Sequence, residues 1–247
     1  MSSTYIFGIH PVATQLKALS DNVEVLYLSN QRHDAKIKFI EEMARNNQIV
    51  LQVVDNQYLD KITGHKNHQG VAAKVNMNRM VDLKQQLQQL DGVSNITFLA
   101  LDGITDPQNL GAILRTAECF GVNLVILPKN NSANIDNAVV MKTASGALNF
   151  LNIALVNNLT QAIELCKEYG FWVAGTSLSQ NSISLDKFEV TPRLLWIMGS
   201  EGNGLKRLVA EHCDYLVTIP MIGKTQSLNV SVATGVVLSY TNMFRNR

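Results

Sequence analysis

From Ile96 to its C-terminus the sequence alternates short apolar runs with segments of helical periodicity, and this alternation restricts the fold more than any other feature. The apolar runs, each suited to a strand, cover residues 96–101, 124–127, 171–174, 194–198 and 215–219. Helical patterns cover residues 110–120, 159–169, 205–213 and 230–244. Strands this apolar are covered on both faces, so the pattern predicts an α/β fold with an open parallel sheet between two layers of helices.

The N-terminal part has the same mixture on a smaller scale. Helical spacing covers residues 10–19 and 35–46, and strand-like runs cover 23–28, 49–54 and 71–75, which predicts a small α/β domain over residues 1–76. A Gln-rich stretch, 84–90, is followed by Asp91-Gly92. We interpret residues 77–95 as a linker with a short helix and 96–247 as the second domain. A surface helix of one continuous domain is the alternative.

Composition narrows the class of protein without indicating a function. With 46% apolar and 17% charged residues the chain is globular, and a net charge of +1 is compatible with RNA or with a small-molecule substrate. Cys119, Cys166 and Cys213 lie far apart, which favours reduced thiols over disulfides or a zinc site. The first residues have no signal-peptide pattern and no apolar run is long enough for a bilayer, so we expect a cytoplasmic protein without membrane partners.

In an open α/β sheet, ligands bind beyond the carboxyl ends of the strands, so the segments that follow the strands are candidate sites. Residues 102–117 form a polar turn that opens a helix. Either Asp106 or Asn109 could cap this helix, and Arg115 could form a surface ion pair. Asn109 and Arg115 are too far apart in sequence to stack on one helical face, but they could converge on a ligand if Asn109 lies in the turn before the helix.

Two later segments also follow predicted strands. Residues 199–204 hold three glycines and one carboxylate, Glu201. Glycines permit positive φ angles or a close approach of a ligand to the backbone. Their spacing is not G-x-G-x-x-G, which argues against a dinucleotide-dependent dehydrogenase. In residues 219–235 a polar loop opens a helix, and Ser227 and Asn229 could cap it.

Together the three segments resemble the three sequence motifs of the SpoU (TrmH-like) branch of the SPOUT RNA methyltransferases. The matching stretches are residues 106–117, 198–205 and 219–231, in the family's order and context. Residues 5–12 and 68–73 resemble the ends of a substrate-binding domain, with the fold of ribosomal protein L30e, that some SpoU enzymes carry. The resemblance implies an L30e-like N-terminal domain, a SPOUT domain with a C-terminal trefoil knot around residues 219–229, and a homodimer whose active site draws on both subunits.

The resemblance also implies the reaction. A methyl group would pass from S-adenosylmethionine to a ribose 2′-hydroxyl of RNA, leaving S-adenosylhomocysteine, without a metal ion. Relatives that carry both domains act on a guanosine in the peptidyl-transferase-centre hairpin of 23S rRNA, which is therefore the expected partner. By the same resemblance, the residues that would hold the cofactor are Thr176, Gly199, Ile219, Met221 and Leu228.

Arg115 is the residue that the resemblance brings nearest to the 2′-hydroxyl. A guanidinium keeps its proton in nearly every protein setting, so we interpret Arg115 as a clamp for an RNA phosphate and a stabiliser of developing negative charge. Glu201 would orient Arg115 or accept the proton. Asn109, Ser227 and Asn229 would position the ribose and the backbone.

Basic residues of the N-terminal domain are further candidates for RNA contacts, which would weaken with salt. They are Lys36, Lys38, Arg45 and Lys66. His65 and His68 could also touch RNA, or they could be ordinary packing or surface histidines. Two rival functions stay open: a tRNA ribose methyltransferase of the same family, and a catalytically silent rRNA-binding assembly factor. The attached N-terminal domain argues against the first, and the intact motif residues argue against the second. DNA is not an expected partner.

Overall fold

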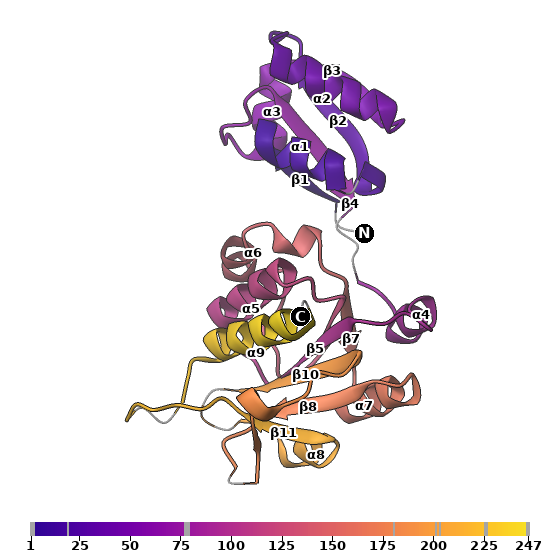
Figure 1. The fold of residues 1–247 in the computed structure, drawn as a ribbon. Helices are drawn as coiled ribbons and strands as arrows, with labels where there is room; N and C mark the ends of the chain where they lie inside the picture. Colours follow the sequence, from indigo (N-terminus) through magenta and orange to yellow (C-terminus); the bar gives the residue numbers. More distant parts are fainter. Residues whose placement is uncertain are drawn as a thin grey trace. The chain divides into compact units, whose positions relative to one another are not determined.

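The structure is a computed structural model that describes residues 3–18, 20–76, 80–179, 181–200, 202, 204–224 and 227–245. The chain divides into two compact units, Met1–Asn78 and Arg79–Arg247. Figure 1 shows the helices and strands of both units.

The smaller unit is a four-stranded sheet with helices on both faces. Its strands are β1 (Ser3–Phe7), β2 (Val23–Ser29), β3 (Val50–Val54) and β4 (Val71–Asn76), in the order β1-β4-β2-β3. Strand β4 is antiparallel to β1 and β2, whereas β2 and β3 are parallel. The helices are α1 (Ile9–Ala18), α2 (Ala35–Asn46) and α3 (Asn56–Thr63). Leu26 and Leu28 of β2 pack with α1 and α2, whereas Tyr27 between them packs with Leu59 of α3, because successive side chains of a strand point to opposite faces.

The larger unit is built on a seven-stranded sheet in which every described pairing is parallel. Its strands are β5 (Ile96–Asp102), β6 (Leu124–Pro128), β7 (Ile153–Val156), β8 (Trp172–Thr176), β9 (Ile183–Ser184), β10 (Arg193–Gly199) and β11 (Tyr215–Thr218). Their order is β7-β6-β5-β10-β8-β11-β9. Strand β10 therefore lies between β5 and β8, and the carboxyl ends of β5, β10, β8 and β11 meet along one edge of the sheet.

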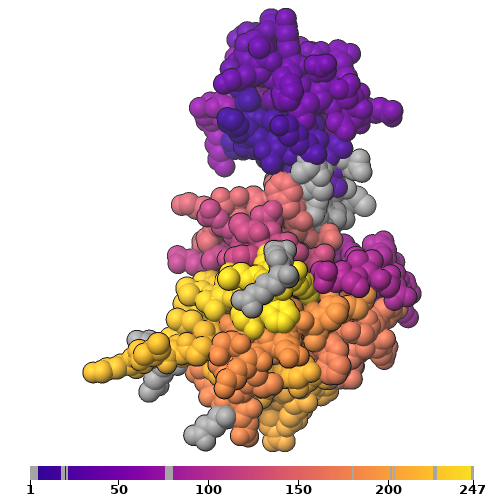
Figure 2. Space-filling model, viewed as in Figure 1, coloured from indigo at the N-terminus to yellow at the C-terminus, as the bar shows by residue number. Residues whose placement is uncertain are grey.

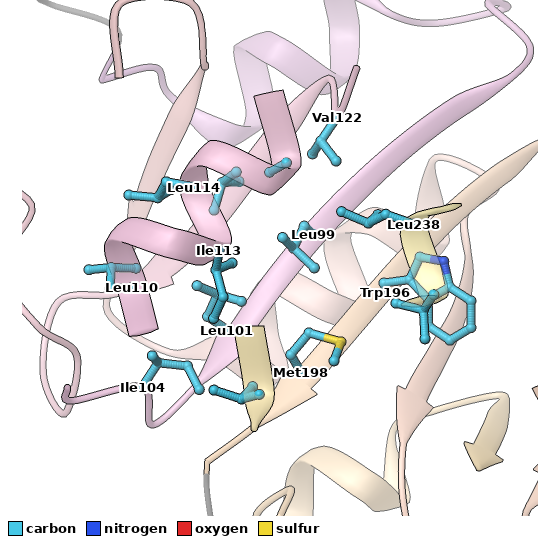
Figure 3. Packing of buried hydrophobic residues seen from close by; sticks show 14 of the residues in the cluster. Leu99, Leu101, Ile104, Leu110, Ile113, Leu114, Val122, Trp196, Met198 and Leu238 are labelled. Atoms are coloured by element: carbon cyan, nitrogen blue, oxygen red, sulfur yellow. The ribbon is translucent and has the colours of Figure 1, made fainter. Parts of the chain in front are cut away.

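Two layers of helices cover this sheet (Figure 1). One layer holds α5 (Pro107–Cys119), α6 (Ala138–Ala144) and α9 (Val230–Arg245), and the other holds α4 (Leu83–Gln89), α7 (Leu159–Glu168) and α8 (Arg207–Glu211). In Figure 3, Leu99 and Leu101 of β5 lie beside Ile113 of α5. Phe98 and Ala100 of the same strand belong to the cluster on the opposite face. This two-sided burial explains why the strand reads as a continuous apolar run.

Polar contacts at the C-terminal end of α9 fix this helix on the sheet. Trp196 Nε1, buried in β10, donates a hydrogen bond of 2.9 Å to Thr241 Oγ1. Arg245 donates to Thr97 Oγ1 at 2.6 Å and to the carbonyl oxygen of Ile96 at 2.9 Å. Burial lowers the pKa of this guanidinium. Since a helix is a stiff rod, contacts at one end also position the other end, which borders the candidate site.

The predicted α/β architecture is confirmed, and the predicted strands agree with the observed ones to within two residues. The elements that the pattern did not predict are β1, α3, α6, β7 and β9. Strands β1, β7 and β9 lie at sheet edges, where a strand pairs on one side and needs little apolar sequence.

The segment predicted to be a linker, residues 77–95, contains α4. Leu83 and Leu87 of this helix are buried in the core of the larger unit, and the backbone N–H of Val81 donates to Ile153 O at 2.9 Å. The alternative interpretation, a surface helix of a continuous domain, therefore describes residues 80–95 better, because the apolar face of α4 covers part of the sheet.

Candidate active site

An open pocket of about 630 Å³ lies at the carboxyl edge of the parallel sheet, where β8, β10 and β11 end. Its described lining residues fall within 176–178, 198–204 and 217–233. They offer apolar side chains, glycine backbone and a few hydroxyl and amide groups, and none of the described lining residues is charged. A pocket of this size and character suits a largely apolar small molecule with a few polar groups.

The glycine-rich loop after β10 forms one wall of this pocket, in a turn that requires glycine. Ser200 and Gly204 exchange two backbone hydrogen bonds, of 3.0 and 2.9 Å, which close the turn. A Cβ atom at Gly199 would lie 2.2 Å from the carbonyl carbon of Gly204, so no side chain fits there. Gly202 and Gly204 have φ angles of +81° and +63°. Gly199, Gly202 and Gly204 therefore contribute only backbone to this wall.

A buried carboxylate holds the chain that follows this loop. Asp102, the last residue of β5, is in register with Gly199, and its side chain is 1% exposed. It accepts a hydrogen bond of 2.8 Å from the backbone N–H of Lys206 and lies 3.2 Å from the Lys206 ammonium. Charge-assisted contacts of this kind are among the stronger hydrogen bonds. The motifs do not indicate this role for Asp102; the available signal is a carboxylate directly after an apolar strand.

Two asparagines connect the first and third predicted loops at this pocket. Asp106, and not Asn109, caps α5, because its Oδ1 accepts the backbone N–H of Asn109 at 2.7 Å. Asn109 is the third residue of the helix, and its Oδ1 accepts a hydrogen bond of 2.9 Å from Asn229 Nδ2. Asn229 Oδ1 accepts the backbone N–H of Ser231 at 2.9 Å, as a helix cap does. Asn229 thus caps α9 and also bridges to α5.

Arg115 lies apart from this arrangement. Its side chain is exposed on α5 and does not line the pocket. Since Asn109 lies inside the helix, the side chains of Asn109 and Arg115 leave it about 120° apart, at roughly 100° per residue. The condition for their convergence on one ligand, Asn109 in the turn before the helix, is therefore not met. The described residues include no hydrogen-bond or ion-pair partner of Arg115.

The other predicted residues divide into those that line the pocket and those that do not. All five predicted cofactor residues line it: Thr176, Gly199, Ile219, Met221 and Leu228. Ser227 and Asn229 line it as well. Glu201 lies outside the described residues.

The residues predicted to contact RNA are spread over the smaller unit. Lys36 and Lys38 are exposed in the first half of α2. Arg45 lies roughly 13 Å further along this helix than Lys36. It pairs with Glu41 at 2.8 Å. The Nζ atom of Lys66, in the loop before β4, lies 5.6 Å from the centre of the Phe7 ring.

Burial keeps two of the three cysteine thiols protonated. Desolvation raises the pKa of Cys166 and of Cys213 to about 12, so neither is a nucleophile at neutral pH. Cys119 is exposed. In the described part of the chain, no three His, Cys, Asp or Glu side chains are grouped so that they could hold a metal ion. None of the helices formed by the described residues has the length and apolar character that a bilayer crossing requires.

Two family models match the sequence. A model described as the SpoU rRNA Methylase family matches residues 96–239, which is more than half of the chain and includes the whole pocket. A model described as RNA 2′-O ribose methyltransferase substrate binding matches residues 5–81.

Similar proteins align over nearly the whole chain. A protein of Nitrosomonas europaea named 23S rRNA (guanosine-2′-O-)-methyltransferase RlmB is 39% identical over 240 residues, which are 97% of this chain and 91% of that protein. The Escherichia coli K12 protein of the same name is 36% identical over 236 residues, 96% of each chain. The crystal structure of an AdoMet-bound rRNA methyltransferase from Sinorhizobium meliloti is similar in fold, with a TM-score of 0.73 at 23% identity, covering 98% of this chain and 87% of that one.

Proposed function

The chain belongs to the SpoU rRNA methylase family, and from this premise we propose that it methylates the ribose 2′-oxygen of a guanosine in 23S rRNA, in the peptidyl-transferase-centre hairpin. It is an S-adenosylmethionine-dependent RNA 2′-O-methyltransferase. The observation that carries the proposal is the pocket at the carboxyl edge of the sheet, because all five residues expected to hold the cofactor line it. Relatives named for the 23S rRNA reaction support the choice of substrate.

The pocket fits the cofactor in chemistry as well as in size. Ile219, Met221 and Leu228 supply apolar surface for the adenine ring, and the backbone of the glycine loop supplies hydrogen-bonding groups. At Gly199 the backbone of Gly204 occupies the space that a Cβ atom would take, so a side chain there would displace this wall of the pocket. S-Adenosylmethionine, when bound, supplies a sulfonium methyl group that the ribose 2′-oxygen attacks in line, with the carbon–sulfur electron pair left on S-adenosylhomocysteine.

The protein's own residues must position the ribose and remove the 2′-hydroxyl proton. We assign to Arg115 the binding of an RNA phosphate and the stabilisation of the charge that develops on the 2′-oxygen, while its guanidinium keeps its proton. Asn109 and Asn229, joined by their hydrogen bond, and Ser227 position the ribose and the backbone. Glu201 is our candidate for orienting Arg115 or accepting the proton.

We also propose a homodimer in which Arg115 of one copy serves the pocket of the other, since Arg115 does not line the pocket of its own chain. An open groove of about 750 Å³ lies between α5 and α9. One of its lining residues, Thr116, directly follows Arg115 in the sequence. It includes Thr116, Phe120, Val232, Val236, Tyr240 and Met243. Val232 and Met243 are 52% and 63% exposed, and a second copy would bury this apolar surface. The loop between β11 and α9 projects from the unit (Figure 2), and its Ile222 is fully exposed.

For the domain roles, we propose that residues 1–76 form an L30e-like RNA-binding domain and residues 96–247 a SPOUT methyltransferase domain. The substrate-binding family model over residues 5–81 supports the first assignment. We propose a trefoil knot formed by the segment around residues 219–229 and the helix that follows it. A cytoplasmic location follows from ribosomal RNA as the substrate.

The test is to incubate the chain with labelled S-adenosylmethionine and total RNA from a strain that lacks the gene, and then to map the labelled nucleotide. We expect label on one guanosine ribose of 23S rRNA. Label in tRNA would instead support the first rival function, a tRNA ribose methyltransferase of the same family. Absence of label from all RNA would support the catalytically silent assembly factor.

A further inference from the structure

A second pocket, of about 550 Å³, lies entirely within the smaller unit. It is formed by the end of β2 and the residues after it, the first turns of α3, and the loop before β4. Apart from one glycine, every side chain that lines it is polar or charged. A ligand in this pocket would therefore be recognised through side-chain hydrogen bonds, which is a different mode from that of the cofactor pocket.

Hydrogen bonds among the lining side chains fix their orientation. Ser29 Oγ donates to Asn56 Oδ1 at 2.7 Å, and Asn56 Nδ2 donates to Gln31 Oε1 at 2.9 Å. An amide nitrogen carries two hydrogens, so the second N–H of Asn56 and the NH₂ group of Gln31 are left for a ligand. His68 Nδ1 accepts the backbone N–H of Gly70 at 3.0 Å, which places the ring proton of neutral His68 on Nε2. That nitrogen lies 3.3 Å from Asp60 Oδ1.

The loop that forms the outer wall is held in a strained conformation. His65 and Gln69 have φ angles of +56° and +54°, a left-handed conformation that costs about 1 kcal/mol for each non-glycine residue. Arg32 donates to the carbonyl oxygen of Gln69 at 2.6 Å, and Gln69 Oε1 accepts the backbone N–H of Ile9 at 3.1 Å. Strain of this kind persists where neighbouring contacts enforce it, and it clusters at ligand-binding sites.

The combination of groups selects the ligand. Amide N–H donors beside the Asp60 carboxylate match the donor and acceptor edge of a nucleobase, and the exposed ammonium of Lys66 at the same pocket suits a phosphate. A free phosphate would gain nothing from Asp60, and an apolar ligand would leave the polar lining groups unpaired. We propose that this pocket binds one unpaired nucleotide of the RNA substrate, reading its base with Asn56, Gln31 and Asp60. The proposal rests on the proposed function, because it presumes that RNA is the substrate.

The first experiment measures RNA binding by the full chain with Gln31→Ala and Asn56→Asp. Gln52→Ala is the matched control, because Gln52 is an exposed glutamine of β3 that does not line the pocket. We expect each pocket variant to raise the Kd for a 23S rRNA fragment roughly tenfold, with kcat at saturating RNA and the Kd for S-adenosylmethionine unchanged. The control keeps the wild-type Kd. Wild-type RNA affinity in both pocket variants, with an unchanged thermal unfolding midpoint, overturns the proposal.

Gln31 is exposed and outside any helix or strand, so Gln31→Ala keeps the test valid if Asn56→Asp lowers the unfolding midpoint. The second experiment replaces each unpaired nucleotide of the fragment by an abasic one. At one position the change should weaken binding to the wild-type chain about tenfold and leave the affinity of Asn56→Asp unchanged, because the same interaction is already lost. If no position behaves in this way, the base is not read and the proposal fails. A chain that binds RNA with this coupling but methylates none would contradict the proposed function alone.

Discussion

The pocket at the carboxyl edge of the larger sheet and the polar pocket of the smaller unit are built from different kinds of groups. The pocket of the larger unit has walls mainly of glycine backbone and apolar side chains, with a few hydroxyl and amide groups, so we expect shape to dominate its selectivity. The pocket of the smaller unit has walls of polar side chains tied to one another by hydrogen bonds, so its selectivity comes from the identity of donors and acceptors. A steric change should therefore damage the pocket of the larger unit most, whereas the pocket of the smaller unit should be sensitive to isosteric changes such as amide to carboxylate.

The largest effect is expected at a residue that lines neither pocket. Arg115→Ala should lower kcat/KM about a hundred- to a thousandfold, because the loss of one preorganised electrostatic group in an active site has this magnitude. The Kd for S-adenosylmethionine should stay within a few-fold of the wild-type value. The measurement is steady-state methylation of 23S rRNA together with calorimetric titration of the cofactor.

Arg207→Ala is the matched control for Arg115→Ala, since Arg207 is an exposed arginine of α8 that pairs only with Glu211 among the described residues. Full turnover in Arg115→Ala would remove Arg115 from the catalytic residues. An equal loss of cofactor affinity and turnover would make its role structural.

The next effect tests the pocket of the larger unit directly. Gly199→Ala should weaken S-adenosylmethionine binding on the order of a hundredfold, because a Cβ atom 2.2 Å from the Gly204 carbonyl carbon forces the loop to move. RNA affinity should be unaffected. Gly223→Ala is the control, since no atom lies within 4 Å of a Cβ at that position. Cofactor affinity that survives in Gly199→Ala would show that the loop does not form the binding wall.

Mixing these two inactive variants tests the homodimer. A dimer of Arg115→Ala with Gly199→Ala keeps one intact pocket, in the chain that lacks Arg115, and one intact Arg115, in the chain with the damaged pocket. If Arg115 serves the partner's pocket, mixing should restore about a quarter of the wild-type rate, since half of the dimers are mixed and each has one working site. If Arg115 acts within its own chain, the mixture stays inactive.

A smaller effect is expected for the bridge between the two asparagines. Asn109→Ala and Asn229→Ala should each lower kcat/KM by about tenfold, and the double variant should lose little more, because both changes remove one shared hydrogen bond. Asn229→Ala alone should also lower the free energy of unfolding by about 1 kcal/mol, since Asn229 caps α9. Additive losses in kcat/KM would indicate that the two side chains act independently.

The strand pattern predicted where the pocket of the larger unit lies, at the carboxyl edge of the sheet, whereas its expected cofactor residues came from the resemblance to the family's motifs. Buried strands leave a local apolar pattern, so the central strands could be predicted directly, but a glycine-rich turn such as the one at Gly199 does not by itself indicate a ligand. The cap of α5 could not be predicted, because Asp106 and Asn109 are equally good caps by type and only the backbone conformation decides between them. The direction of the Arg115 side chain relative to that of Asn109 depends on which of the two residues caps the helix. The polar pocket joins three segments with no shared pattern, and of its residues only Lys66, His65 and His68 were candidates for RNA contact.

The smallest effect concerns the stability of the smaller unit, and it tests whether the two units respond separately. Burial, followed by contact with Tyr58, raises the pKa of Tyr27 to about 12 from its ordinary value of 10.0. Since the folded-state pKa of Tyr27 is the higher one, ionisation of its hydroxyl favours the unfolded state. The free energy of unfolding of the smaller unit therefore keeps its full value below pH 10 and falls as the pH rises towards 12, by roughly 1 kcal/mol at pH 11. Tyr27→Phe should remove that part of the pH dependence in urea unfolding followed by circular dichroism. Both tryptophans, Trp172 and Trp196, lie in the larger unit, so the transition seen by their fluorescence should be the same in both proteins. A shift in the fluorescence transition would show instead that the two units unfold together.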